Sequence, residues 1–83
     1  MRLKKVTPKA LKVLSKYKLD VIDNQQYVQN LLKVAQDEKA VQEVCETIFD
    51  EDFSQTDFAE MDLSEFHKGV RDFLSQFLLP SSA

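Results

Sequence analysis

Residues that break helices are scarce in this chain, which has one glycine and two prolines among 83 residues. A fold of several strands needs tight turns, and such turns draw mainly on glycine, proline, asparagine and aspartate. Apolar residues instead recur at the three- and four-residue steps of a helix face. The sequence therefore predicts an all-α protein, a single small helical domain over residues 1–83.

Four helices are predicted, near residues 7–17, 24–35, 37–49 and 63–78. Each follows a residue whose side-chain oxygen can accept hydrogen bonds from the first free N–H groups of a helix, namely Thr7, Asp23 or Asn24, Asp37 and Asp62. In the second helix the residues expected to face the core are Tyr27, Val28, Leu31, Leu32 and Ala35. In the third they are Val41, Val44, Cys45, Ile48 and Phe49.

Periodicity fails between residues 50 and 61, where acidic and small polar residues alternate with Phe53, Phe58 and Met61. This segment is predicted to be an acidic, irregular linker held by three apolar anchors. Its charge belongs to a wider asymmetry. Residues 1–18 hold seven lysines or arginines and no acid, whereas residues 37–65 hold eleven acids and one lysine. Such a chain can neutralise itself on folding, pair head to tail or present opposite faces to partners, and the sequence leaves these alternatives open.

No constellation of catalytic residues is recognisable. The only cysteine, Cys45, excludes an internal disulfide framework, and its place in an apolar helical stripe predicts a small buried side chain. The only histidine, His67, flanks the apolar stripe of the last helix and is expected at a partly exposed position. The sequence therefore predicts a protein that is not an enzyme and has no cofactor.

A calcium loop starting at Asp50 is also excluded. Asp50, Asp52 and Ser54 could fill its first three ligand positions. However, Gln55 stands where the loop needs glycine, and Met61 stands where it needs a bidentate glutamate. No metal site is expected.

The last helix carries the sharpest functional signal. Its apolar residues follow a heptad spacing at Leu63, Phe66, Val70, Phe73 and Phe77. One interpretation is an ordinary core helix. The other is a partner-binding strip, completed by Phe53 and Phe58 of the linker, because aromatic anchors with a charged rim are typical of protein-binding surfaces. We take the second as the working hypothesis.

The ends of the chain resemble a known family. The segments that carry this resemblance are Leu3-Lys4-Lys5-Val6-Thr7-Pro8, Ile48-Phe49-Asp50-Glu51-Asp52-Phe53, Met61-Asp62-Leu63-Ser64-Glu65-Phe66, Gly69-Val70 and Asp72-Phe73-Leu74. They are similar to the short tail assembly chaperones of long-tailed bacteriophages and prophages. The resemblance implies a helical protein that holds the tape-measure protein, recruits tail-tube subunits and is absent from the finished tail. It also implies a longer form made by translational frameshifting.

Two other function classes compete with this one. The first is a small nucleic-acid-binding regulator that uses Lys5, Lys9, Lys12 and Lys16 of the basic first helix. The second is a self-assembling structural subunit, since a homo-oligomer is compatible with the chain. No apolar run approaches the length of a membrane span, the longest being Phe77-Leu78-Leu79, so no membrane partner is expected and the cytoplasm is the expected location.

Overall fold

The computed structural model describes residues 2–21 and 23–78, and for 77 and 78 only the backbone. The elements are α1 (Pro8–Lys16), α2 (Asn24–Ala35), α3 (Glu38–Ile48), the short 3₁₀ helix η1 (Phe58–Glu60) and α4 (Leu63–Leu78). The prediction of a small all-α fold with four helices is confirmed, and each helix end lies within one residue of its expected place. No helix among the described residues is long and apolar enough to cross a bilayer.

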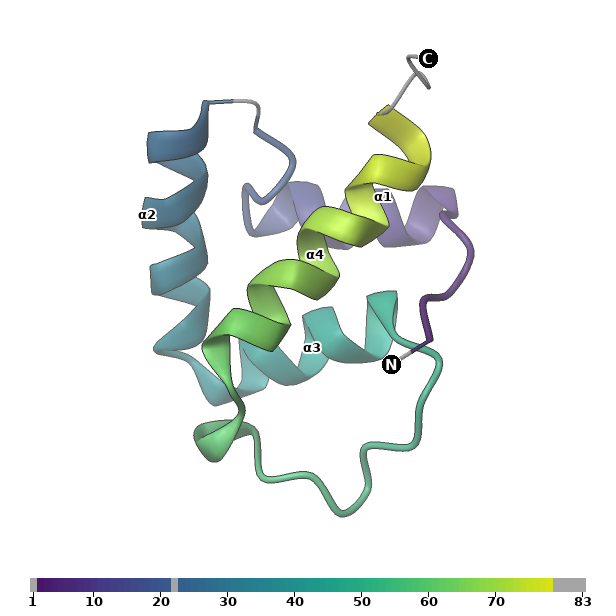
Figure 1. Cartoon of the computed structure of the whole chain (residues 1–83), viewed down its shortest axis with the longest axis vertical. Helices are drawn as coiled ribbons and strands as arrows, with labels where there is room; N and C mark the ends of the chain where they lie inside the picture. Colours follow the sequence, from purple (N-terminus) through teal and green to yellow (C-terminus); the bar gives the residue numbers. More distant parts are fainter. Residues whose placement is uncertain (1, 22, 79–83) are drawn as a thin grey trace.

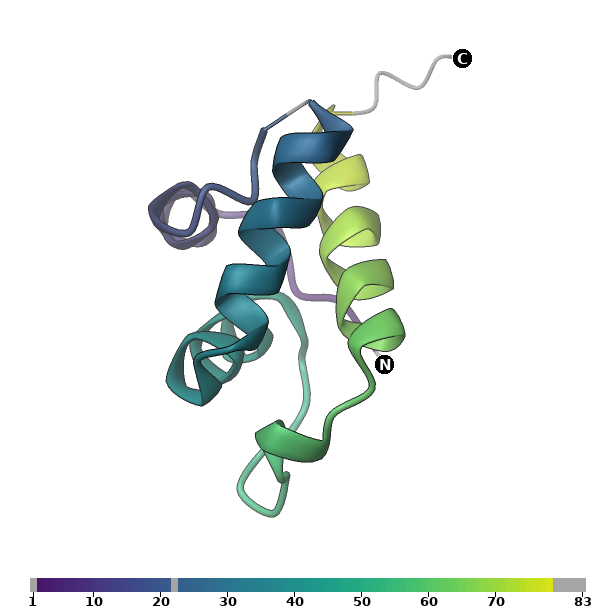
Figure 2. The same cartoon turned by 90° about the vertical axis from the view of Figure 1, so that its left-hand side faces the viewer.

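Helix α3 is the centre of the fold, because α1, α2, α4 and η1 all pack against it. Figure 1 shows α2 descending at one side while α4 rises diagonally, with α1 behind it. α2 and α4 run in roughly opposite directions; in Figure 1 they are close at their lower ends, and α4 then crosses diagonally away from α2. Figure 2 shows the same two helices from the side of α2. The last helix thus returns across the front of the molecule and lies over α3.

The predicted caps account for where the helices begin. The hydroxyl of Thr7 accepts a hydrogen bond from the backbone N–H of Ala10, at 3.1 Å. The carboxylates of Asp23, Asp37 and Asp62 accept from backbone N–H groups in the first turns of α2, α3 and α4. Each cap satisfies a donor that the helix itself leaves without a partner, which is typically worth about 1 kcal/mol.

The end of α1 is built without the usual glycine. Lys18 adopts a left-handed conformation, with φ of 56°. Its N–H donates to the carbonyl of Ser15 at 3.0 Å, and the N–H of Leu19 donates to Leu14 at 2.9 Å. This is a Schellman motif, and it is completed by burial of both Leu14 and Leu19. Leu19, which follows the end of α1, is therefore a core residue.

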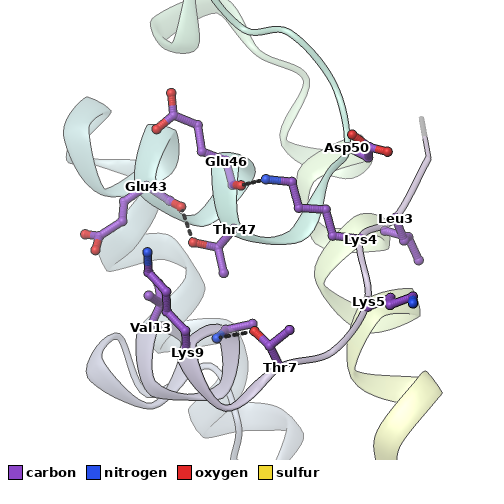
Figure 3. A pocket seen from close by; sticks show the side chains of 11 residues that line it. Leu3, Lys4, Lys5, Thr7, Lys9, Val13, Glu43, Glu46, Thr47 and Asp50 are labelled. Atoms are coloured by element: carbon purple, nitrogen blue, oxygen red, sulfur yellow. Dashed lines mark hydrogen bonds between the residues drawn. The ribbon is translucent and has the colours of Figure 1, made fainter.

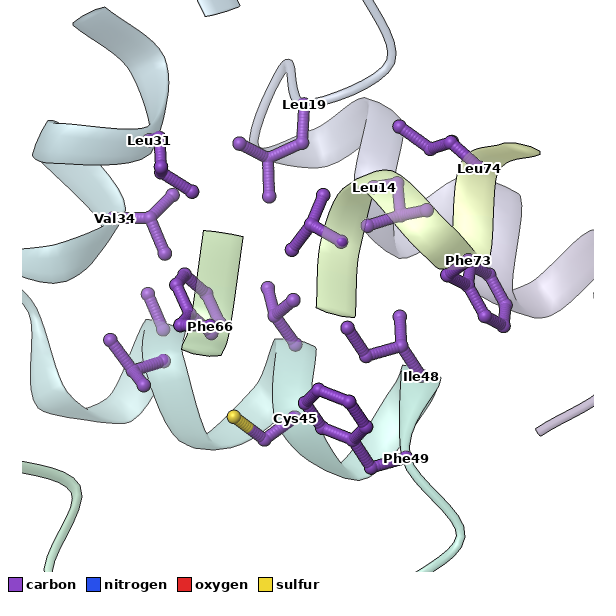
Figure 4. Packing of buried hydrophobic residues seen from close by; sticks show 14 of the residues in the cluster. Leu14, Leu19, Leu31, Val34, Cys45, Ile48, Phe49, Phe66, Phe73 and Leu74 are labelled. Carbon is purple, nitrogen blue, oxygen red and sulfur yellow. The ribbon is translucent and has the colours of Figure 1, made fainter. Parts of the chain in front are cut away.

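The core lies on the upper side of α3 in the view of Figure 4, where side chains from the other helices converge. α3 contributes Ala40, Val41, Val44, Cys45 and Ile48, with Phe49 directly after it. The inward stripe predicted for this helix is therefore confirmed, including the burial of Cys45. In the connector before α2, Val21 is half-buried against the core, and Ile22 is outside the described residues.

The amino-terminal segment is tied to the end of α3, which the sequence did not predict. Leu3 and Phe49 form an isolated antiparallel bridge. On either side of it, the N–H of Lys4 donates to Ile48 and the N–H of Asp50 donates to Arg2, both at 2.8 Å. This pairing holds the chain before α1 against the exit of α3.

Gly69 explains how α4 lies so close to this point. A Cβ atom on Gly69 would overlap the ring of Phe49, so only glycine leaves room for that ring against the backbone of α4. The group that packs against the backbone of α4 at this point is therefore an aromatic side chain.

Candidate protein-interaction face

The structure places most of the predicted partner-binding strip in the core. Phe53, Phe58, Phe66, Val70 and Phe73 are all buried, with between 0% and 8% of their surface exposed. Leu63 is exposed at 39%. Phe77 lies in α4, but its side chain is outside the described residues. In this conformation the five buried residues of the strip belong to the interior and not to the surface.

Packing against α3 is the physical reason. The heptad stripe of α4 faces the apolar side of α3, so Phe66 and Phe73 complete its core (Figure 4). Phe53 and Phe58 extend that core under the acidic segment, with ring centroids 5.6 Å apart, and Phe53 lies 6.3 Å from Phe49. Burial of each such ring stabilises the fold by roughly 1.5–3 kcal/mol. The five phenylalanines whose side chains the structure describes are thus all buried within the chain.

The exposed apolar side chains lie elsewhere. Among the described residues the large hydrophobic side chains with the most exposure are Val28 at 39%, Leu32 at 46% and Leu63 at 39%. The prediction that Val28 and Leu32 face the core is wrong. α2 buries Tyr27, Leu31 and Val34 instead, and successive helical residues are rotated by about 100°. Val28 and Leu32 therefore lie to one side of the buried line.

Side-chain contacts show that this side of α2 is turned toward α4. The hydroxyl of Tyr27 is 3.2 Å from Nδ1 of His67. The guanidinium of Arg71 lies 5.5 Å from the centre of the Tyr27 ring, and it donates a long hydrogen bond of 3.4 Å to Asn24. The start of α2 is therefore beside the middle of α4.

The opposite ends of the two helices also meet. Ala35 at the end of α2 and Leu63 at the start of α4 line the same cavity of about 200 Å³, together with Phe58 of η1. Leu32 lies about one helical turn before Ala35 and therefore near this end of α2. We call this surface the seam face, formed by Asn24, Val28, Leu32 and Ala35 of α2 and Leu63, His67 and Arg71 of α4.

The α2 side of the seam face carries no charged residue, although 30% of the chain is charged. The α2 residues that border it on the outer side are Gln25, Gln29 and Gln36. The only charged residue of α2, Lys33, lies on the side of the helix toward α1, where it lines a cavity with Lys18 and Asp37. Depletion of charge around exposed aliphatic side chains distinguishes the centres of protein interfaces from ordinary surface.

A second candidate is the open cleft between the amino-terminal segment and α3, which has a volume of about 800 Å³. Figure 3 shows Lys4 reaching across it to the carbonyl oxygen of Glu46, at 2.8 Å. Its rim carries three lysines and three acids, namely Lys4, Lys5, Lys9, Glu43, Glu46 and Asp50. Charges of both signs surround a small apolar base, so the electrostatics of the cleft favour neither an anionic nor a cationic ligand.

The polar edge of α3 also binds the end of α1. Tyr17 donates its hydroxyl hydrogen to the carboxylate of Glu43, and the ammonium of Lys16 lies 3.1 Å from the same group. The hydrogen bond from Tyr17, followed by that from Lys16, holds the pKa of Glu43 below its usual value. The pKa values of Tyr17 and Lys16 are raised, in each case mainly by the hydrogen bond with Glu43.

These contacts bear on the charge asymmetry. Lys4 and Lys16 are bound to α3, and Arg2 lies 3.9 Å from the carboxylate of Asp50 at an exposed position. Part of the basic segment is thus matched by acids of the same chain. Lys5, Lys9, Lys12 and Lys18 are exposed. Lys5 and Lys9 line the same cleft as acids of α3, and such a mixture of charges is an unfavourable surface for nucleic acid.

Two titratable side chains, those of Cys45 and Tyr27, lie in the interior of the fold. Cys45 is fully buried, its sulfur 3.6 Å from that of Met61, and burial raises the pKa of its thiol to about 12. Burial likewise raises the pKa of Tyr27 to about 12. Within residues 2–21 and 23–78, no three histidine, cysteine or acidic side chains come together as a metal site.

Comparisons with protein-family models, with curated proteins and with solved structures give no match to this chain.

Proposed function

We propose that this chain is a non-catalytic protein-binding module that contacts its partner through the seam face. The observation that supports this most is the pair Val28 and Leu32, both exposed on a side of α2 that carries no charge. Leu63 of α4 adds a third aliphatic side chain at the same end. Scattered exposed aliphatic residues need no explanation, but a group of them across two adjacent helices is typical of interaction surfaces.

The position of the binding residues differs from the sequence-based hypothesis, but the class of function is the same. Phenylalanine residues of α4 and the acidic segment stabilise the module, while aliphatic residues on its surface make the contact. The acidic segment keeps the module soluble, since Glu51, Asp52, Asp57 and Glu60 are all exposed.

The resemblance to tail assembly chaperones gives the first client to test. On this proposal the seam face holds an apolar stripe of a tape-measure protein and leaves the module available to recruit tail-tube subunits. A gene located between those of a tail tube and a tape-measure protein would favour this client. A gene in an unrelated neighbourhood would exclude the tape-measure protein as the client and leave only the proposal of a protein-binding module.

Co-purification tests the proposal with residues chosen from the seam face. The chain would be co-expressed with the tape-measure protein from the same genome. Leu32→Glu and Leu63→Glu are expected to lose the client because each places a charge in the apolar centre of the contact. Gln26→Glu is the matched control, because it adds the same charge to the exposed opposite side of α2.

The three variants should have the circular dichroism spectrum and melting temperature of the wild type. Retention of the client by Leu32→Glu and Leu63→Glu would contradict the use of the seam face. Equal loss of the client by Gln26→Glu would do the same.

A further inference from the structure

We propose that residues 51–61 form a flap that detaches from α3 as a unit while the four helices stay folded. These residues follow α3, loop out at the lower end of the molecule and lead through η1 into α4 (Figures 1 and 2). Local opening of this kind occurs in segments that have few bonds to the rest of a fold. The contacts of the flap meet this condition.

The backbone of the flap is bonded to itself. Within the part of the chain that the structure describes, its backbone hydrogen bonds run from Thr56 to Phe53, from Glu60 to Asp57 and from Met61 to Phe58. The carboxylates of Asp52 and Asp57 accept further hydrogen bonds from N–H groups two residues along the chain. All of these bonds can therefore persist when the flap lifts.

Both ends of the flap are fixed. Just before it, the N–H of Asp50 donates to the carbonyl of Arg2 at 2.8 Å. Just after it, the carboxylate of Asp62 accepts from the N–H of Ser64 at 2.9 Å and caps α4. The flap can therefore lift between two fixed points without separating α3 from α4.

The charged side chains of the flap form no bond to the helices that opening would break. The two ion pairs among the described residues, Arg2 with Asp50 and Lys16 with Glu43, both lie outside it. The acids of the flap are all exposed, namely Glu51, Asp52, Asp57 and Glu60. Their carboxylates are hydrated in the closed state and remain so in the open state.

Three apolar side chains hold the flap closed. Phe53 and Phe58 are buried, and Met61 packs against the core with its sulfur 3.6 Å from that of Cys45. The rings of Phe53 and Phe58 are 5.6 Å apart, so this contact is internal and moves with the flap. The contact between Phe53 and Phe49, at 6.3 Å, is broken by opening. Opening thus exposes a small part of the apolar surface that the whole fold buries.

The only cysteine of the chain reports on this opening. Cys45 is fully buried beside Met61, and burial raises the pKa of its thiol to about 12. Since the thiolate is the reactive form, the thiol in the closed state is neither accessible nor ionised. Alkylation of Cys45 therefore requires either opening of the flap or unfolding of the whole chain.

Alkylation of the full chain by iodoacetamide, a slow and neutral reagent, distinguishes these two routes. The rate at each urea concentration is divided by the rate for the fully unfolded chain, which gives the fraction of molecules with an accessible thiol. At low urea this fraction should exceed the globally unfolded fraction by about tenfold or more. It should also vary little with urea, because opening exposes little surface.

Two matched variants identify the part of the molecule that moves. Phe58→Leu weakens an anchor of the flap and should raise the alkylation rate at low urea by about fivefold or more. Phe73→Leu makes the same substitution in α4, whose ring stays packed when the flap is open. It should lower global stability, measured by circular dichroism, and leave the alkylation rate at low urea unchanged.

Three results would overturn the flap. The first is an accessible fraction equal to the globally unfolded fraction at every urea concentration. The second is an equal increase in both variants, which would assign exposure of Cys45 to global unfolding or to release of α4. The third is an alkylation rate that Phe58→Leu does not change. None of these measurements involves a client, so their outcome is independent of whether the seam face binds one.

Discussion

Helices α2 and α3 follow one another in the chain and have similar apolar content, but the folded molecule surrounds them differently. α3 has neighbours on several sides, so its apolar stripe is buried and its polar edge is bonded to α1 through Glu43. α2 packs mainly on α3, and Val28 and Leu32 remain uncovered beside its buried line. The comparison shows that the buried width of an apolar stripe depends on how many other helices pack against it. The apolar side chains of α2 that no other helix covers are available to a partner.

The largest effect is expected from the interior between α3 and α4. Phe73→Ala should destabilise the fold by about 3–5 kcal/mol, because it removes a fully buried ring and leaves a cavity. Chemical denaturation monitored by circular dichroism measures this. A loss below about 1 kcal/mol would mean that α4 does not close over α3 in solution and that the phenylalanine strip is accessible after all.

A smaller loss is expected from Gly69→Ala. Alanine is favoured over glycine inside a helix by about 1 kcal/mol, but its methyl group would overlap the ring of Phe49. Overpacking of this kind typically costs about 1–3 kcal/mol. We therefore expect a net loss of stability in thermal melts. In the variant Phe49→Leu, the same Gly69→Ala change should become neutral or stabilising, which identifies the ring as the cause.

The polar edge of α3 should contribute less and depend on pH. Glu43→Gln is expected to lower stability at neutral pH by about 0.5–1 kcal/mol, as is usual for a partly exposed hydrogen-bonded ion pair. Because folding lowers the pKa of Glu43 below its usual 4.5, the wild-type advantage is present above that value and is lost as the pH falls further. Denaturation curves of both proteins should therefore converge in acid. A gap that persists there would assign the effect to packing.

The smallest effect on stability is expected at the exposed side of α2. Leu32→Ser should change the free energy of unfolding by no more than about 0.5 kcal/mol beyond the cost in helix propensity, because nearly half of the leucine is already exposed. Thermal melts at low concentration measure the monomer. A loss similar to that of Phe73→Ala would mean that Leu32 belongs to the core, and the contrast between α2 and α3 would disappear.

The helices could be predicted from the sequence because their signals are local. Caps such as Thr7 and Asp23 and the three- and four-residue apolar steps depend only on near neighbours along the chain. Depth of burial is not local. The stripes containing Val28 and Val44 have the same spacing, and only the positions of the other helices distinguish an exposed residue from a buried one.

The candidate site was harder to predict from the sequence, because depth of burial is not a local property. Aromatic residues such as Phe66 are suited both to a core and to an interface, and the periodicity is identical in the two cases. The one available signal was the low charge of α2, where Lys33 is the single charged residue in a chain rich in charge. The left-handed turn at Lys18 and the bridge from Leu3 to Phe49 have no comparable local signature.

The bridge between Leu3 and Phe49 has a consequence for how the molecule is assembled. The backbone before α1 pairs with the residue that follows α3, Phe49, and the ring of Phe49 packs against α4 at Gly69. Phe49 thus connects the beginning of the chain, through its backbone, with the last helix, through its ring. A bulky fusion placed directly before Leu3 would loosen α4 as well, although the two are far apart in sequence.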